Sequence, residues 1–343
     1  MSELLAKLAS HIRKASNPAL HVVSGSDLQE DAPGLAAAEP KTAKAEPLDG
    51  SRGMDPVKVG EPVSGKLSYF LDGIERTHVP CYYSMVPIVY GYVAAVIRKR
   101  GPDCAMRTHC QPLSSEALYF PLRLVHSAGF EEAGIPVMDT ETGNQPLEEH
   151  PLILREAARV AISKARGRLE TQLSRAWLSE FEGGDDWLVV DGSLGGTLGG
   201  DYARWPGPNI LGVIKSHQTQ YFPMDEQRKV LGLRAGERSG LFRPLERERQ
   251  APVHSWYLRL RPNEGRDVYF GLIRLEIPAS DRSEDIAEQV SRWLLAERCP
   301  LSLPDARWDR MLYPVRDCEQ YLRSLAPSRI ALEASMIGVG AVR

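Results

Sequence analysis

Two aspartates stand where an apolar segment runs into a glycine. Residues 187–190 lead into Asp191, residues 67–71 lead into Asp72, and a glycine follows each aspartate. Short apolar runs bounded by glycine are typical of buried strands, and a carboxylate at the edge of a core is unfavourable unless it has a partner. If the two strands are neighbours, their carboxylates lie together and could bind a divalent metal ion. Alternatively, each Asp-Gly pair only marks a turn.

A long helix predicts a third acid. Apolar residues recur at three- and four-residue steps over about 30 residues from Pro151. The strand that follows the helix travels back about 16 to 20 Å to reach Asp191. The same distance along the helix corresponds to some 11 to 13 residues before its end near residue 182. Counting back by that number leads to Glu170. Because Glu170 shares a helix face with Leu173 and Trp177, we expect it to point towards the sheet. The alternative is a glutamate that faces solvent.

A third apolar segment, residues 209–214, ends in Lys215. A lysine beside clustered acids could bind a scissile phosphate, or keep the carboxylates ionised when no metal is bound. Otherwise it is an exposed strand end. The stretch 228–249 is basic and punctuated by glycine, which suits a phosphate backbone. Its interleaved glutamates fit a solvated charged surface equally well.

Composition bounds the class of protein. With 343 residues, 43% of them hydrophobic and 25% charged, the chain can bury a full core. No apolar run approaches the roughly 20 residues of a membrane span, so we expect a cytoplasmic protein with no membrane association. The net charge of -3 argues against a globally basic nucleic-acid binder but allows a local basic groove. Five cysteines without a C-x-x-C pair indicate neither a disulfide framework nor a zinc ribbon.

The chain divides near residue 60. We expect residues 1–60 to comprise a short N-terminal amphipathic helix and a flexible linker, because few large apolar groups follow residue 15. Residues 61–343 form the ordered domain. Its expected strands cover 66–71, 85–97, 117–125, 187–191, 209–214, 254–261 and 267–277, and the later helices cover 283–297 and 314–325. Strands mixed with helices predict an α/β fold.

Taken in order, these motifs resemble the NurA nuclease family over about residues 65–330. They are Phe-Leu-Asp72-Gly, a long helix bearing Glu170, Val-Val-Asp191-Gly-Ser-Leu, Leu-Gly-Val-Ile-Lys215-Ser and Ile-Arg274-Leu-Glu276-Ile-Pro. The resemblance implies an RNase H-like core, a mixed β-sheet flanked by helices, in which Asp72, Glu170 and Asp191 hold Mn²⁺ or Mg²⁺. It also implies a DNA nuclease that forms a homodimer and works with a HerA-type hexameric ATPase, in DNA end resection and repair or in defence against foreign DNA.

One departure concerns the last metal ligand. Family members commonly present a histidine after a Tyr-Pro motif, but no histidine follows Tyr313-Pro314 here. We expect Asp317 or Glu319 to take its place. In two-metal hydrolysis of a phosphodiester, Asp72 and Asp191 would contact both ions, and Lys215 would neutralise charge in the transition state. The alternatives are a catalytically silent clamp that binds DNA for the same ATPase, and an enzyme that acts on RNA or hybrids.

Overall fold

A computed structural model of the chain describes residues 2–15, 20–22, 41–125, 129–141, 143, 147–181, 184–198, 209–217, 219–245, 252–264, 267–298 and 308–336. The α-helices of this part are α1 (Glu3–Ala15), α2 (Pro151–Glu180), α3 (Leu194–Leu198), α4 (Met224–Leu231), α5 (Ser283–Glu297), α6 (Tyr313–Leu325) and α7 (Arg329–Met336). Two 3-10 helices span Leu122–Leu124 and Trp308–Arg310. In the described part of the chain, none of the helices combines the length and the apolar character needed to cross a bilayer.

The strands build one large sheet and a small separate pair. They are β1 (Leu20–Val22), β2 (Lys41–Thr42), β3 (Ala45–Pro47), β4 (Val57–Lys58), β5 (Leu67–Tyr83), β6 (Val86–Arg100), β7 (Met106–Thr108), β8 (Leu113–Phe120), β9 (Val137–Asp139), β10 (Trp187–Asp191), β11 (Ile210–Ile214), β12 (Thr219–Gln220), β13 (Glu237–Arg238), β14 (Phe242–Pro244), β15 (Val253–Arg259) and β16 (Leu272–Pro278). The main path of the large sheet runs β3-β14-β15-β16-β11-β10-β5-β6-β8-β9.

The centre of the sheet is mixed. Strand β10 pairs in parallel with both β5 and β11, whereas the β5/β6, β6/β8 and β11/β16 pairs are antiparallel. All five residues of β11 are buried, as are the first four of β10, because helices cover both faces there. The expected α/β class, a mixed sheet flanked by helices, is confirmed.

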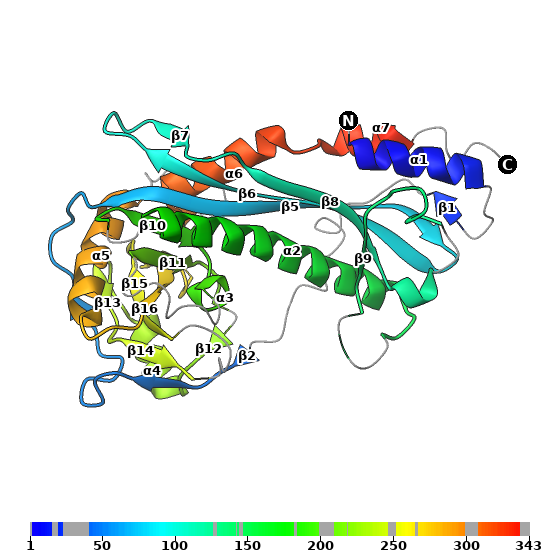
Figure 1. Cartoon of the computed structure of the whole chain (residues 1–343). Helices are drawn as coiled ribbons and strands as arrows, with labels where there is room; N and C mark the ends of the chain where they lie inside the picture. Colours follow the sequence, from blue (N-terminus) through cyan, green and yellow to red (C-terminus); the bar gives the residue numbers. More distant parts are fainter. Residues whose placement is uncertain are drawn as a thin grey trace.

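Two layers of helices enclose the sheet (Figure 1). On one face, Leu173 and Trp177 of α2 pack with Leu188 and Val190 of β10. On the other face, α5 and α6 pack over a larger core that includes Trp256 of β15. The recurrence of apolar residues predicted α5 at its observed bounds and α2 within two residues of them.

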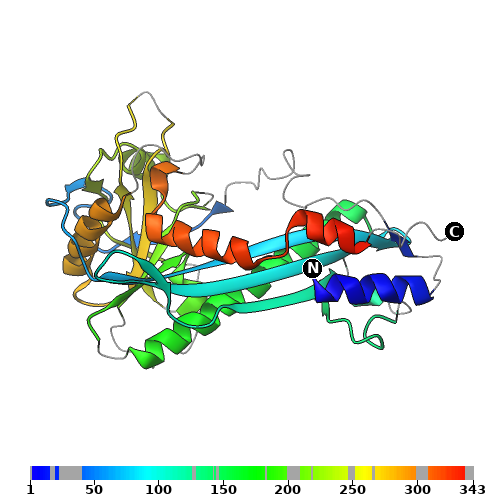
Figure 2. The ribbon, with the colours of Figure 1, turned by 90° about the horizontal axis from the view of Figure 1, so that it is seen from above.

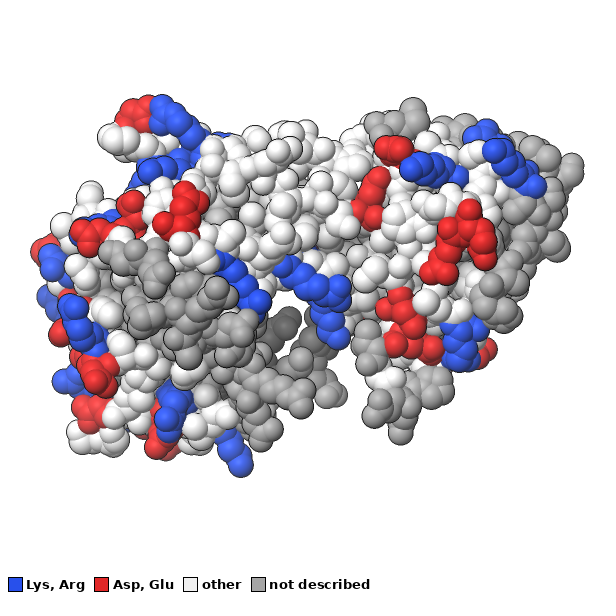
Figure 3. Space-filling view, in the orientation of Figure 1, with Lys and Arg blue, Asp and Glu red and all other residues white. Residues whose placement is uncertain are grey.

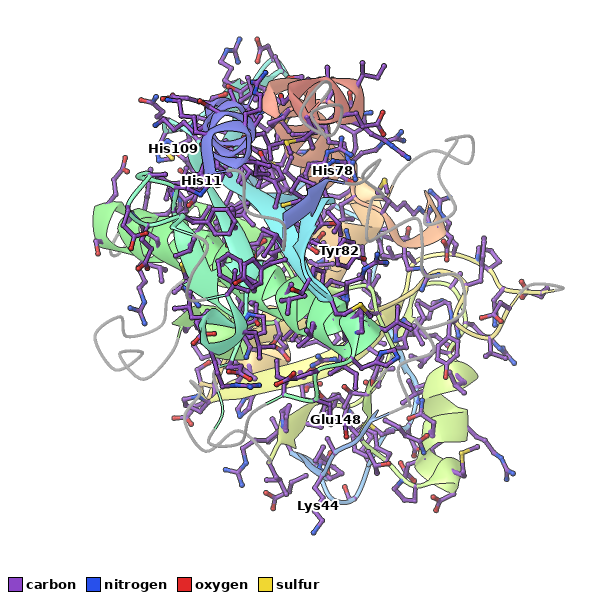
Figure 4. The ribbon with its side chains drawn as sticks, turned by 90° about the vertical axis from the view of Figure 1, so that its right-hand side faces the viewer. His11, Lys44, His78, Tyr82, His109 and Glu148 are labelled. Carbon is purple, nitrogen blue, oxygen red and sulfur yellow. The ribbon has the colours of Figure 1, made fainter. Side chains whose placement is uncertain are left out.

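Strands β5 and β6 extend far beyond β10 (Figures 1 and 2). The 17 residues of β5 span about 56 Å at 3.3 Å per residue. Seen from above, α6 and α7 lie along these strands, and α1 lies at their far end beside α7. Figure 4 looks along the molecule from that end and shows His78 and Tyr82 on β5 between α2 and the helices of the other face.

Two expectations need correction. Residues 41–60, expected to be part of a flexible linker, contribute β2, β3 and β4 and bury Met54 completely. Their pairing with β12, β14 and β13 supplies the hydrogen bonds and the burial that local composition did not suggest. Residues 16–19 and 23–40 lie outside the described residues. The expectation that a strand ends at Asp72 is also wrong, because β5 continues to Tyr83 along β6.

Candidate active site

Asp72 and Asp191 lie on neighbouring strands. The parallel register of β10 and β5 pairs Val190 with Leu71, the residues that directly precede the two aspartates. Paired strands are about 4.8 Å apart, so the expectation that these two strands lie side by side is confirmed. Strand β10 ends at Asp191, whereas β5 continues past Asp72. The two carboxylates therefore lie near each other at the point where β10 ends beside β5.

Lys215 is the direct partner of Asp191. It follows β11, which pairs with β10 so that Asp191 lies opposite Val213. The Lys215 Nζ donates a hydrogen bond to Asp191 Oδ2 at 2.7 Å, and the two side chains are only 15% and 21% exposed. The ammonium group thus neutralises this carboxylate in the metal-free arrangement, one of the two roles expected for it.

The strand residues of the site lie on one face of the sheet. Side chains alternate along a strand: Leu71 packs in the core against α2, and Phe70 packs in the core against α5 and α6. Asp72 has the same parity as Phe70. The alternation along β10 also places Asp191 on the face of α5 and α6, together with its partner Lys215.

Glu170 approaches from the opposite face. It lies on α2, its side chain is 13% exposed, and its Oε1 occupies the space that a Cβ on Gly73 would need. The expectation that Glu170 points towards the sheet is confirmed. The glycine after Asp72 is therefore the point at which the helix carboxylate reaches the strand.

The three acids influence one another electrostatically. Burial, the charge of Asp191 and the charge of Glu170 raise the pKa of Asp72 well above its usual range, although Lys215 opposes the shift. Burial also raises the pKa of Glu170, as do Asp191 and Glu75, while Arg166 lowers it. The charges of Asp191 and Glu170 thus act on Asp72, and the charge of Asp191 acts on Glu170.

Sequence reasoning missed Glu75 and Arg166. The Arg166 Nε lies 3.7 Å from Glu75 Oε2 and 3.5 Å from Glu170 Oε1. Both could have been suspected, because Glu75 follows Gly73 at the next position of the same strand face, and Arg166 precedes Glu170 by one helical turn. The acid cluster, defined as Asp72, Glu75, Glu170 and Asp191 with Arg166 and Lys215, has four carboxylates and two cations.

The two candidates for the fourth ligand each pair with an arginine. Asp317 Oδ1 accepts a hydrogen bond from Arg98 Nε at 2.8 Å. Glu319 pairs with Arg323, four residues later on α6, at 2.7 Å. The structure therefore brings Asp72, Glu170, Asp191 and Lys215 together, whereas Asp317 pairs with Arg98 and Glu319 with Arg323. The sequence could not indicate that Arg98, on β6, would lie beside Asp317.

A metal site is not preformed. Among the described residues, no three His, Cys, Asp or Glu side chains are arranged so that they could hold one metal ion. The two strand aspartates and Glu170 belong to different faces of the sheet, which accounts for this. The chemistry of the donor set still suits a hard divalent cation, because all its donors are carboxyl groups and the acid cluster contains two more acids than basic residues.

The basic stretch 228–249 is largely engaged within the fold. Arg238 is buried and pairs with Glu284 at 2.6 Å, and Arg243 pairs with Glu46 at 2.5 Å. Residues 246–250 lie outside the described residues. The chain matches no protein-family model and no curated protein.

Proposed function

We propose that this protein is a divalent-metal-dependent DNA nuclease with an RNase H-like core. The observation that carries the proposal is the electrostatic coupling of Asp72, Glu170 and Asp191 where β10 ends beside β5. A cation bound among these acids would relieve the repulsion that raises the pKa values of Asp72 and Glu170. The three antiparallel strands β5, β6 and β8, the helix α2 and the two parallel strands β10 and β11 support the RNase H-like assignment.

Asp72, Glu170 and Asp191 would hold the metal, Mn²⁺ or Mg²⁺. When bound, such an ion lowers the pKa of water and stabilises the oxygen that leaves the phosphodiester. Lys215 pairs with Asp191 at 2.7 Å. Once Asp191 has another positive partner, the ammonium group is free to contact a phosphate oxygen and stabilise the charge that builds there.

A polyanionic substrate fits the surface beside α2. Figure 3 shows a hollow between the two ends of the molecule, with Lys and Arg side chains at its edge, and α2 crosses the same region in Figure 1. Lys164 and Arg168 of α2 are exposed, and neither forms an ion pair with a residue in the described part of the chain. Unpaired cations along one helix suit a phosphate backbone.

The partners are proposed from the family resemblance. A homodimer that works in the cytoplasm with a HerA-type hexameric ATPase, in end resection and repair or in defence against foreign DNA, follows from the order of the motifs around Asp72, Asp191 and Lys215. The rival function is a catalytically silent clamp that binds DNA for the same ATPase. The absence of a preformed metal-binding group among the described residues favours this rival.

A cleavage assay separates the two functions. End-labelled single- and double-stranded DNA is incubated with the protein and Mn²⁺, Mg²⁺ or EDTA, and the wild type is compared with Asp191→Asn. Asp185→Asn is the matched control, because Asp185 also pairs with a lysine at 2.7 Å but is 88% exposed and lies before the strand. We expect cutting that depends on Mn²⁺ or Mg²⁺, is lost in Asp191→Asn and is retained in the control.

A different result would support the clamp. Wild-type protein that binds DNA but cuts neither substrate, alone or with the ATPase, would refute the nuclease proposal. Equal cutting by wild type and Asp191→Asn would refute the site. A single-stranded RNA substrate of the same sequence tests the alternative of an enzyme that acts on RNA.

A further inference from the structure

Glu276 is a fully buried acid that the acid cluster does not include. It lies on β16 and has no exposed surface. Its Oε2 accepts hydrogen bonds from Ser193 Oγ and from the Leu194 backbone N–H, both at 2.8 Å. Ser193 and Leu194 belong to the loop that directly follows Asp191. This loop, residues 192–194, is called the Asp191 loop below.

Glu276 reaches this loop across an intervening strand. Strand β11 lies between β10 and β16, and its Gly212 is directly opposite Glu276. A Cβ on Gly212 would lie 2.7 Å from Gly192 O and 3.0 Å from the Leu194 side chain. The glycine therefore leaves the space in which the Asp191 loop folds over β11. Because of this close approach, a side chain from β16 can bind a loop that begins on β10.

Arg274 holds the other side of the Glu276 carboxylate. Arg274 is 6% exposed, and its Nη1 lies 2.5 Å from Glu276 Oε1 and 3.2 Å from Ser255 Oγ. Its guanidinium also lies 5.1 Å from the centre of the Tyr221 ring. Buried charges of this kind persist only when their hydrogen bonds are satisfied. Glu276 is therefore held in one position by Arg274 and cannot turn towards a bound ion.

The backbone of the Asp191 loop adds a further restraint. Gly192 adopts φ +134°, a conformation that favours glycine, and its N–H bonds to Val213 O at 3.0 Å. The two hydrogen bonds to Glu276 hold Ser193 and Leu194, and the Leu194 side chain is fully buried. They also satisfy a backbone N–H at the start of α3, as a helix cap does.

We propose that Glu276 is a positioning residue that fixes the Asp191 loop, and through it the carboxylate of Asp191, for metal binding. This inference rests on the proposed nuclease function and deepens it. Glu276 touches neither substrate nor metal; it acts through Ser193 and Leu194. Residues that orient metal ligands in this way typically change metal affinity or activity by about 10- to 100-fold when altered.

Two variants test the proposal. Glu276→Gln removes the negative charge, whereas Ser193→Ala removes one hydrogen bond and leaves the buried Arg274 pair intact, so it remains informative if Glu276→Gln folds poorly. Hydrogen exchange of the amides of residues 192–194 in the metal-free protein measures the loop directly. We expect about 10-fold faster exchange or more in Glu276→Gln, and a smaller increase in Ser193→Ala.

Manganese binding and turnover measure the consequence. We expect the Mn²⁺ dissociation constant of Glu276→Gln to rise about 10- to 100-fold. The kcat at low Mn²⁺ should fall and should recover when Mn²⁺ is raised, while KM for DNA stays unchanged. A residue with a purely structural role would lower thermal stability without this dependence on Mn²⁺ concentration.

Glu116 supplies the matched control. It accepts hydrogen bonds from the Leu4 N–H at 3.2 Å, from Ser2 Oγ at 2.6 Å and from the Tyr90 hydroxyl at 2.8 Å, and so shares one backbone and one serine donor with Glu276. It lies on β8 opposite Tyr92, midway along β6, and binds the start of α1. Glu116→Gln should loosen α1 and leave Mn²⁺ affinity and kcat unchanged.

The failures of the two proposals can be told apart. Exchange at residues 192–194 that stays at the wild-type rate in both variants overturns the positioning role, whether or not the protein cuts DNA. Faster exchange with unchanged Mn²⁺ affinity and kcat also overturns it. Wild-type protein that neither binds Mn²⁺ nor cuts DNA overturns the nuclease function, and with it the role in metal binding, while the exchange result still decides what Glu276 does to the loop.

Discussion

Gly73 and Glu170 are matched to each other. Glu170 Oε1 occupies the volume that a Cβ at position 73 would take, and the Arg166 side chain lies 3.0 Å from the same point. A residue on the face of the sheet opposite to Asp72 can therefore reach the strand only because the residue after Asp72 has no side chain. The glycine permits the approach of the helix acid to the two strand acids.

Gly73→Ala should therefore impair function more than stability. The nearest atom is the end of a flexible glutamate, but Arg166 Cγ at 3.0 Å and the backbone oxygen of Ala94 at 3.1 Å must also shift, so we expect a loss of stability of about 1 to 2 kcal/mol. Displacing Glu170 should weaken Mn²⁺ binding about 10-fold or more and reduce cleavage in parallel. Thermal unfolding, Mn²⁺ titration and the cleavage assay measure the three quantities.

Gly167→Ala is the control for that variant. Gly167 lies on α2 next to Arg166, and a Cβ there would meet nothing within 4 Å. Alanine should stabilise the helix by up to about 1 kcal/mol and leave Mn²⁺ binding unchanged. If both glycine variants weakened Mn²⁺ binding equally, rigidity of α2 rather than the position of Glu170 would be responsible.

Lys215→Met should change metal affinity and turnover in opposite directions. In the metal-free protein, the ammonium group neutralises Asp191 at 2.7 Å. Its removal leaves Asp191 available to a cation, so the Mn²⁺ dissociation constant should fall. The kcat should also fall, by about 10²-fold or more, because the group that stabilises charge on the phosphate is lost. A kcat equal to that of the wild type would remove Lys215 from the catalytic residues.

Asp72→Asn should stabilise the metal-free protein. Because the pKa of Asp72 is raised by burial and by Asp191 and Glu170, its contribution to stability is present below the ordinary carboxyl pKa of about 4 and is lost as pH rises through the raised value. Asparagine does not titrate and can still accept the hydrogen bond of the Gly73 N–H. At pH 7.5 we expect a Tm higher by on the order of 2 °C, an advantage that disappears below about pH 4.

Adding Mn²⁺ should make the wild type more stable than Asp72→Asn. The wild type gains stability from a ligand that binds the folded state, whereas Asp72→Asn has lost a donor and gains less. Scanning calorimetry of both proteins, with EDTA and with Mn²⁺, measures whether the difference in Tm changes sign. If Asp72→Asn were less stable than the wild type in EDTA at pH 7.5, the repulsion inferred for the acid cluster would be contradicted.

Acidification should weaken metal binding at an unusually high pH. Both Asp72 and Glu170 must be ionised to bind a cation, and both pKa values are raised. Mn²⁺ affinity should therefore decline as pH falls, beginning well above the range near 4 at which ordinary carboxylates protonate. Titration of Mn²⁺ at a series of pH values tests this, and constant affinity down to pH 5 would exclude it.

Asp317→Asn tests the expected fourth ligand. In the structure this carboxylate pairs with Arg98, and the two side chains are 24% and 12% exposed. Asparagine should lower the free energy of unfolding by about 1 kcal/mol, after allowance for solvent screening, and leave Mn²⁺ affinity unchanged. A drop in Mn²⁺ affinity without a loss of stability would show instead that Asp317 leaves Arg98 and binds the metal.

The sequence by itself determined the local elements and three of the four acids, Asp72, Glu170 and Asp191, but not Glu75. The periodicity of α2 and the apolar runs of β10 and β11 are local patterns, so their bounds could be predicted closely. The choice of Glu170 required only the lengths of a helix and of the strand that returns along it. These quantities depend on residues close together in the chain.

The tertiary structure decided everything that depends on which segments become neighbours. The pairing of residues 41–60 with distant strands, the ion pair between Asp317 and Arg98, and the reach of Glu276 across Gly212 to the Asp191 loop all join residues far apart in sequence. Strand order and register are set by non-local packing, which no short sequence window contains. For the same reason, only the structure could show that Glu170 and the two strand aspartates reach the site from opposite faces of the sheet.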